Sequence, residues 1–194
     1  MVNYERKLIE LVTHQAWMID VLKHARDAGL PDWYIAAGTI RNTVWNYLHG
    51  FPTTLYQKDV DLIYYDAEDK PGERGKRGEA AKKFLEKTAP RVTWDIVNQA
   101  WTHLFYYNPV RRKPQVSSAA EAIAYWSEIP TCVGINLEED DSLTVYAPHS
   151  LTDLFELRVK PVPPPYQDLE LYYRRLNEKK WRDKWPKLRI ETPK

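Results

Sequence analysis

The stretch KDVDLIYYD, residues 58–66, constrains this chain most, because it places two aspartates one residue apart in what otherwise reads as a buried strand. A buried charge costs free energy unless something pairs with it. Side chains alternate across a strand, so Asp59 and Asp61 project from one face, roughly 7 Å apart along the chain. Two neighbouring anions need a cation between them or free access of water. A Mg²⁺ site is the economical explanation, since Mg²⁺ is usually held by one or two carboxylates and substrate phosphates.

Other interpretations of the two aspartates stay open. In the plainest, Asp59 lies at the solvent end of the strand and Asp61 is its exposed neighbour on an edge strand. A phosphohydrolase with an aspartate nucleophile is also conceivable. A calcium loop is excluded, because Ile63 and Tyr65 stand where oxygen ligands and a glycine would be needed.

The segment AAGTIRN, residues 36–42, predicts a strand that turns into a helix at Gly38 and Thr39. Gly38 permits a sharp turn and close backbone approach, and the free N–H groups of a helix start favour an anion such as phosphate. Arg41, in the first helical turn, is expected to reach the same anion. The alternative is an ordinary strand-to-helix turn with Thr39 as the N-cap.

Asp95 is a further carboxylate in an apolar strand, within VTWDIVNQ, residues 92–99. If this strand lies beside the one that carries Asp59 and Asp61, three carboxylates converge. Such a set suffices for two metal ions that clamp a phosphoryl displacement. The alternative is a strand-end aspartate that accepts hydrogen bonds from the backbone.

Strands that alternate with helices predict an α/β (α+β) fold with a mixed central sheet flanked by helices. We expect one helix over 4–28, a short helix before Pro90, a helix capped by Ser117 or Ser118, and a pair of strands within 130–148. The segment SLTDLFELRV is expected to form a helix, and a last helix is expected over 166–185. The predicted organisation is a body over 1–160, followed by a Pro-rich spacer and a basic, aromatic helix over 161–194 that packs on the same unit.

The composition is that of a globular chain, with 43% apolar and 28% charged residues among 194. No apolar run is long enough for a membrane helix, and the N-terminus lacks a secretory signal, so a cytoplasmic location is expected. The single cysteine, Cys132, is expected to be a small buried hydrophobe. The net charge is only +1, but residues 158–194 carry eleven Lys or Arg against five Asp or Glu.

Three elements in this order, AAGTIRN, KDVDLIYYD and TWDIV, resemble the DNA polymerase beta-type nucleotidyltransferase superfamily. Together with WDIVNQAWTHL, TCVGINL and APHSLTDLF, they resemble a bacterial family of stand-alone nucleotidyltransferase-like proteins. The resemblance runs from about Trp33 to the C-terminal Trp/Pro segment. The sequence departs from the superfamily pattern in two respects: Thr39 replaces a commoner Ser or Gly, and the interval from Gly38 to Asp59 is longer than usual.

The resemblance implies a role for each matching residue. Asp59 and Asp61 would bind two Mg²⁺ or Mn²⁺ ions, and Asp95 would complete the site and help to activate the acceptor hydroxyl. The residues expected to hold the nucleotide triphosphate are Gly38, Thr39, Arg41 and Asn42. The implied reaction moves a nucleoside monophosphate from an NTP to an unidentified acceptor, whether small molecule, RNA or protein, with release of pyrophosphate.

Each of the remaining candidates also has a structural interpretation. Asn98, Gln99 and His103 match the family pattern near nucleotide or acceptor, but the side chains of Gln99 and His103 could instead satisfy backbone groups on a helix. Lys58 could meet a phosphate or be solvated. The basic aromatic C-terminal helix could stack on nucleic acid or pack on the body. A non-catalytic nucleotide-sensing module is the alternative to the enzyme.

Overall fold

The computed structural model describes residues 3–52, 59–70, 75–105 and 114–193. Lys58 lies outside the described residues. The elements are α1 (Tyr4–Thr13), α2 (Ala16–Asp27), β1 (Trp33–Ala36), α3 (Ala37–His49), β2 (Asp59–Tyr64), α4 (Gly75–Thr88), β3 (Thr93–Asn98), the 3-10 helix η1 (Gln99–Trp101), α5 (Thr102–Phe105), α6 (Ala119–Ala124), the 3-10 helix η2 (Ile129–Thr131), β4 (Gly134–Leu137), β5 (Leu143–Tyr146), α7 (Thr152–Phe155), β6 (Arg158–Val159), α8 (Leu169–Lys179), α9 (Trp181–Lys184) and β7 (Arg189–Ile190).

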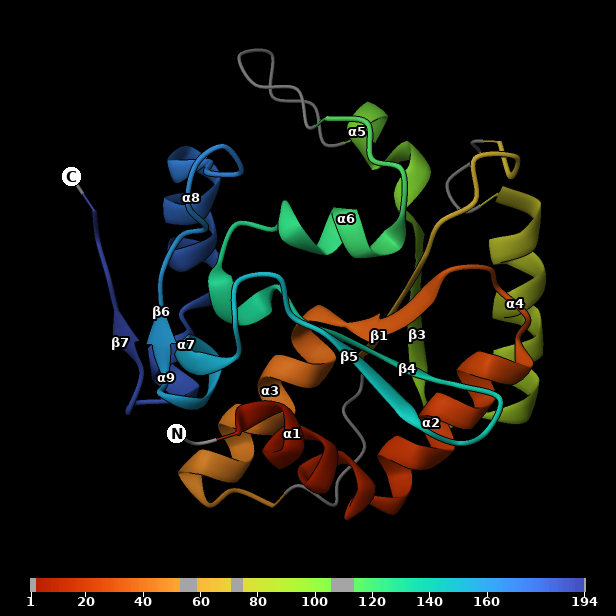
Figure 1. Cartoon of the computed structure of the whole chain (residues 1–194), viewed down its shortest axis with the longest axis horizontal. Helices are drawn as coiled ribbons and strands as arrows, with labels where there is room; N and C mark the ends of the chain where they lie inside the picture. The colour runs from red at the N-terminus through yellow and green to blue at the C-terminus, as the bar shows by residue number, and fades with distance from the viewer. Residues whose placement is uncertain (1–2, 53–58, 71–74, 106–113, 194) are drawn as a thin grey trace.

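The expected mixed sheet is confirmed. Within the described residues, five strands pair in the order β3-β2-β1-β4-β5. β2 and β3 are parallel, whereas β1 is antiparallel to both β2 and β4, and β4 is antiparallel to β5. In Figure 1, α6 lies on one side of this sheet, and α1 and α2 lie on the other, so different helices cover the two faces.

The side chains of β2 alternate between the hydrophobic core on one face and the predicted site on the other. Val60, Leu62 and Tyr64 are fully buried in the main hydrophobic cluster, together with residues of α2 and α4. Asp61 and Ile63 project from the opposite face. β3 repeats the pattern, with Trp94 in the same cluster. The side of β2 and β3 that carries aspartates is therefore the side that α2 and α4 leave uncovered.

The prediction of one helix over 4–28 was wrong, because the chain breaks between α1 and α2 at His14 and Gln15. Gln15 has an extended backbone, with φ −111° and ψ 98°. Side chains replace the lost helical hydrogen bonds: Gln15 Nε2 donates to Leu11 O, and Trp17 Nε1 donates to Gln15 Oε1 at 2.9 Å. The break lets both helices bury their apolar faces in one core.

Two further helix predictions were too long. The segment SLTDLFELRV forms only α7, after which the chain enters β6. The last predicted helix divides into α8 and α9 at Lys180, whose φ of +44° is left-handed, and β7 then pairs in parallel with β6. The pairing of β6 with β7 is non-local, which is why local periodicity could not reveal it.

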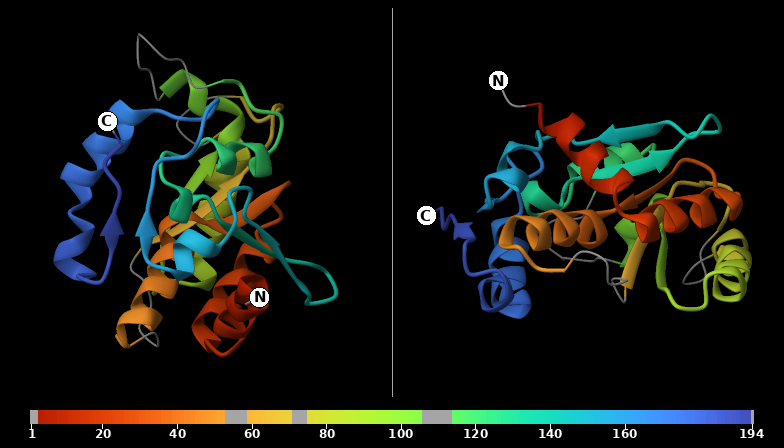
Figure 2. Two further views of the ribbon diagram at one scale, coloured as in Figure 1. Left: turned by 60° about the vertical axis from the view of Figure 1, so that its left-hand side comes forward. Right: turned by 90° about the horizontal axis from the view of Figure 1, so that it is seen from below.

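The C-terminal segment lies against α3 (Figure 2). The ring of Trp45 meets those of Trp181 and Trp185 at centroid distances of 5.8 and 5.1 Å, both edge-on. Tyr172 is buried and its hydroxyl donates to the backbone oxygens of Val159 and Glu191. The aromatic residues of this segment thus pack on the body.

Smaller predictions were correct. Ser118 caps α6 by accepting a hydrogen bond from Glu121 N, and β4 and β5 flank an acidic turn. Cys132 is buried, and its Sγ donates to Glu128 O at 3.4 Å. In the part of the chain that the structure describes, no helix is both long and apolar enough to cross a membrane.

Candidate functional site

A cavity of about 390 Å³ lies over the face of β2 and β3 that carries aspartates. Asp61 on β2 and Asp95 on β3 line it, beside the start of α3. The far side comes from later parts of the chain, the segment 126–131 and helix α8. Segments far apart in the sequence therefore enclose one polar space.

Asp61 and Asp95 are direct neighbours in the parallel register of β2 and β3. Paired residues of adjacent strands lie about 4.8 Å apart and project to the same side. Asp61 is half-buried and Asp95 is exposed. The two carboxylates thus lie on adjacent strands and line the same cavity.

Burial raises the pKa of Asp61 above its ordinary value, and the negative charge of Asp95 raises it further. Hydrogen bonds from the Thr39 and Gly38 backbone and the charge of Arg41 oppose this rise. Thr39 N donates to Asp61 Oδ2 at 3.1 Å, and Asp61 N donates to Thr39 Oγ1 at 2.7 Å. Thr39 is thus not the N-cap of α3, since Ala36 holds that position, but a buried link between α3 and β2.

Gly38 matters for a reason other than the predicted turn. The left-handed residue at the junction of β1 and α3 is Ala37, with φ +47°. Gly38 itself lies in α3 and has no positive φ, but a Cβ there would lie 2.9 Å from Asp61 Oδ2. Only glycine lets the start of α3 approach this carboxylate so closely.

The pair of carboxylates fits a hard divalent cation. Across the described residues, no group of three or more His, Cys, Asp or Glu side chains is arranged to hold a metal by itself. Asp61 and Asp95 nevertheless offer two adjacent oxygen donors whose mutual repulsion a cation would relieve. Mg²⁺ commonly takes one or two carboxylates and completes its shell with substrate phosphates and water.

Asp59 lies apart from the pair. It is exposed at the first residue of β2 and does not line the cavity, although alternation gives it the same face as Asp61. Its register partner on β3 is Thr93. The structure therefore brings two of the three predicted carboxylates into direct register.

Arg41 lines the cavity but is largely engaged within the protein. It is buried, Nη1 donates to Thr131 Oγ1 at 2.8 Å, and Nη2 donates to Asn42 Oδ1 at 2.9 Å. Its guanidinium carbon lies 5.0 Å from the Trp45 ring centroid and 4.8 Å from that of Trp181. Burial lowers the pKa of Arg41 to about 10, so this side chain stays charged at neutral pH.

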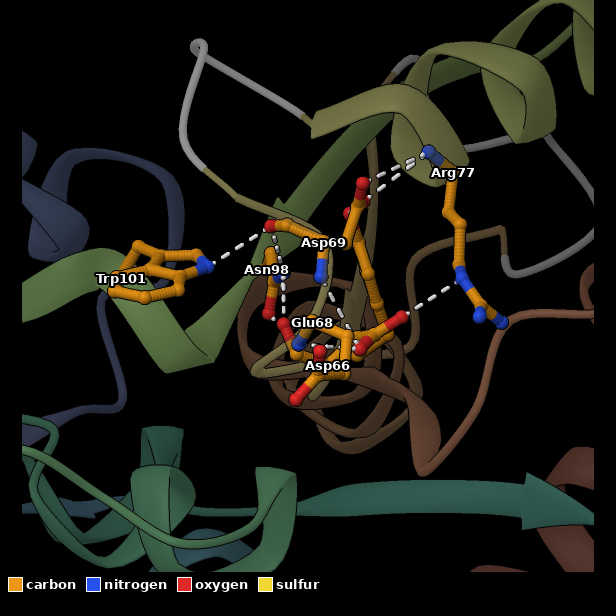
Figure 3. Close-up of polar contacts among 7 residues, drawn as sticks. Asp66, Glu68, Asp69, Arg77, Asn98 and Trp101 are labelled. Carbon is orange, nitrogen blue, oxygen red and sulfur yellow. Dashed lines mark hydrogen bonds and ion pairs between the residues drawn. The ribbon is translucent and has the colours of Figure 1, made fainter.

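Asn98 has a structural position. Its Nδ2 donates to Asp66 O at 2.8 Å, and its Oδ1 accepts from Asp66 N and Ala100 N. Figure 3 shows how Asn98 and Trp101 hold the loop that follows β2. The amide of Asn98 thus joins the ends of β2 and β3.

Gln99 and His103 differ in position. Gln99 is buried and lines the cavity, with Nε2 donating to Val97 O at 3.4 Å. His103 does not line the cavity, and its ring lies 6.3 Å from that of Trp101. Of this pair, only Gln99 faces the same space as Asp61.

Sequence reasoning missed the cavity residues supplied by the second half of the chain. These are chiefly Trp126, Ser127, Thr131, Leu171, Arg175 and Lys179. The available signal was the spacing of Arg175 and Lys179, which places both bases on one side of a helix. The sequence gives no indication of which surface that side would meet.

The chain is similar to known proteins both in sequence and in fold. The family model described as nucleotidyltransferase matches residues 23–190. No curated protein matches the sequence significantly. An NMR structure described as revealing a CCA-adding enzyme head domain is 28% identical, with a TM-score of 0.83, over 97% of this chain and 96% of that one.

Longer chains described as CCA-adding enzymes share the fold. The Thermotoga maritima CCA-adding enzyme complexed with tRNA is 16% identical, with a TM-score of 0.56, over 95% of this chain and 42% of that one. A CCA-adding enzyme complexed with CTP gives the same four values. This chain thus spans less than half the length of those enzymes. The family match covers most of the residues described above, and the chain belongs to the nucleotidyltransferase family.

Proposed function

We propose that this protein transfers a nucleoside monophosphate from an NTP to an acceptor hydroxyl and releases pyrophosphate, in a reaction that depends on Mg²⁺ or Mn²⁺. The observation that carries the proposal is the register pairing of Asp61 with Asp95 in a cavity that also contains cationic side chains. Carboxylates for metal and cations for phosphate are the groups that nucleotidyl transfer needs. Membership of the nucleotidyltransferase family supports the reaction class.

The metal would be held by Asp61 and Asp95, with Asp59 joining from the same face of β2 and two ions bound in all. When bound, it would neutralise phosphate charge and orient the triphosphate. The N–H groups at the start of α3 already lie close to Asp61, with Thr39 N at 3.1 Å. Gly38 and Thr39 would therefore position both Asp61 and the nucleotide.

The chemical step is a substitution at the α-phosphorus. The acceptor oxygen forms a bond to that phosphorus, and the bond from the α-phosphorus to the bridging oxygen breaks. Pyrophosphate leaves with the electron pair. Asp95 is exposed and lines the cavity, and in this proposal its carboxylate receives the proton of the acceptor hydroxyl.

The test is incubation of the protein with Mg²⁺ or Mn²⁺, each α-labelled NTP in turn, and a cell extract as the source of acceptor. We expect label transfer together with pyrophosphate release, and we expect Asp61→Asn and Asp95→Asn each to abolish both. Thermal melting of each variant distinguishes lost chemistry from lost folding.

Other results would contradict transfer. Release of inorganic phosphate without pyrophosphate would identify a phosphohydrolase. Tight, metal-dependent NTP binding with no turnover in any extract would identify a nucleotide-sensing module. Wild-type transfer activity in Asp61→Asn would contradict the proposed metal site.

A further inference from the structure

Helix α8 contributes two cations to the cavity, one helical turn apart. Arg175 and Lys179 both line it, opposite the strands that carry Asp61 and Asp95. The Arg175 side chain is 28% exposed, and Lys179 is exposed. Within the described residues, Lys179 has no ion-pair partner. The cavity therefore joins a metal-binding pair of carboxylates to a pair of bases.

A buried carboxylate holds Arg175 in place. Arg175 Nε donates to Glu128 Oε1 at 2.6 Å, and Glu128 is 0% exposed. Ser127 Oγ donates to the same oxygen at 2.7 Å. The guanidinium also lies 5.9 Å from the ring centroid of Trp181. These contacts fix the orientation of a side chain that would otherwise sample many rotamers.

The outer nitrogens of Arg175 remain available. Among the hydrogen bonds and ion pairs of the described residues, Arg175 takes part only through Nε, which donates to Glu128. Nη1 and Nη2 donate to no acceptor in this part of the chain. A guanidinium presents paired N–H groups that match two phosphate oxygens, and such charge-assisted contacts are strong. Arg175 is thus preorganised to donate hydrogen bonds to a phosphate group.

Arg41 is less suited to this role, because Thr131 and Asn42 already accept its hydrogen bonds. Its positive charge still adds to the field in the cavity. The sequence predicted that Arg41 would contact phosphate. In the structure Arg175, more than a hundred residues later in the chain, is better placed for this contact than Arg41.

Building on the proposed function, we infer that Arg175 and Lys179 bind the β- and γ-phosphates of the NTP, and that Glu128 is the positioning residue for Arg175. The α-phosphate must lie near Asp61 and Asp95 for transfer, which leaves the outer phosphates to extend toward α8. Recognition is of the polyphosphate, whatever the base.

The experiment measures binding of inorganic tripolyphosphate, ATP and AMP by calorimetry, with Mg²⁺ present. We expect Arg175→Ala to weaken binding of tripolyphosphate and ATP by about 10- to 100-fold, as for loss of a charged hydrogen-bonding pair, with AMP binding unchanged. Lys179→Ala should have a smaller effect in the same direction. The matched control is Arg174→Ala, which removes an exposed neighbouring base that does not line the cavity.

Two further variants separate binding from folding. Arg175→Lys keeps the charge without the paired N–H groups and should bind ATP between wild type and Arg175→Ala. Glu128→Gln should raise the KM for NTP with little change in kcat, whereas a purely structural role would change melting temperature and leave KM unaltered. Unchanged tripolyphosphate affinity in Arg175→Ala, or no binding by wild type, would overturn the inference.

Failure of the inference is distinguishable from failure of the proposed function. Arg175-dependent tripolyphosphate binding without nucleotidyl transfer supports the phosphate site and rejects the transferase. Transfer with a KM for NTP that is the same in wild type and Arg175→Ala supports the transferase and rejects the phosphate site.

Discussion

At the scale of single residues, the site depends on how closely α3 approaches β2. Thr39 exchanges hydrogen bonds with Asp61 through both backbone and hydroxyl groups, and Gly38 leaves the space for this contact. Glycine is required at position 38 because a Cβ would come too close to the Asp61 carboxylate, and not because of a positive φ. The positive φ at this turn belongs to Ala37.

Gly38→Ala should therefore damage catalysis more than folding. The added Cβ would lie 2.9 Å from Asp61 Oδ2, so the carboxylate must shift. Misplacement of a reacting group by about 1 Å can cost on the order of 100-fold in rate, and we expect kcat to fall by roughly 10- to 100-fold. Steady-state kinetics with thermal melting test this, and an unchanged kcat in a folded variant would contradict it.

Asp61→Asn should stabilise the protein at high pH. Burial and Asp95 raise the folded-state pKa of Asp61 above its ordinary 3.8, so ionisation of this carboxyl opposes folding. The cost is absent below that ordinary value and grows as pH rises through the folded-state pKa. Without metal, we expect equal melting temperatures near pH 3.5 and a higher melting temperature for the variant than for wild type at pH 8; in a chain of this size each ~1 kcal/mol moves the melting temperature by about 2–4 °C.

Asp59→Asn is the control for this pH series, because Asp59 is exposed at the start of β2. Its melting temperature should follow wild type at every pH. An Asp61→Asn variant that is less stable than wild type at pH 8 would mean that the hydrogen bonds from Thr39 outweigh the cost of burying the charge.

At the scale of elements, the loop after β2 fixes α4 and the end of β3 in one place. Arg77 N, near the start of α4, donates to both carboxylate oxygens of Asp69 at 3.2 Å (Figure 3). Tyr64 OH donates to Asp69 Oδ2 at 2.9 Å. Arg77 Nε also pairs with Asp66 Oδ2 at 2.9 Å. The carboxylates of Asp66 and Asp69 thus have partners within the protein, so these two aspartates are explained without a separate metal site.

Asp69→Ala should reduce stability and spare chemistry. It leaves the buried Tyr64 hydroxyl and the start of α4 without their acceptor, at a cost of about 1–3 kcal/mol. Urea unfolding should show this loss, with kcat within a few-fold of wild type. Glu68→Ala, at an exposed position in the same loop, is the matched control and should unfold like wild type. Loss of metal-dependent activity at unchanged stability would instead assign Asp69 to the site.

At the scale of the whole molecule, the C-terminal segment closes the cavity that the central sheet opens. Trp181 and Trp185 are buried against Trp45, and Trp185 Nε1 donates to Asn46 Oδ1 at 2.9 Å. This packing fixes α9 against α3. The adjoining helix α8 can then present its bases to the strands that carry Asp61 and Asp95.

Trp185→Ala should consequently cost both stability and substrate affinity. Removal of a buried tryptophan typically costs about 3–5 kcal/mol, and a displaced α8 should raise the KM for NTP. Urea unfolding and steady-state kinetics measure the two effects. Arg182→Ala, at an exposed position of α9, should change neither. A Trp185→Ala variant with wild-type stability would show that the segment is not part of the cooperative fold.

The sequence by itself determined the elements that carry local signals. Alternation around Asp59 and Asp61 predicts a strand with its carboxylates on one face, and Gly38 with Thr39 predicts the strand-to-helix junction beside it. These features depend on backbone geometry over a few residues. The order of such elements predicted the mixed sheet, and the resemblance of three of them indicated the nucleotidyltransferase family. The structure confirms the sheet, and the family match confirms the family.

Only the tertiary structure decided which side chains share the cavity. Strand pairing set Asp61 beside Asp95 and left Asp59 exposed, and hydrogen bonding assigned Asn98 to a loop while Gln99 faced the cavity. Arg175 reached the site through the packing of Trp181 and Trp185. The physical reason is that periodicity reports which side of an element a residue occupies, whereas the surface opposite that side depends on contacts between residues far apart in the chain.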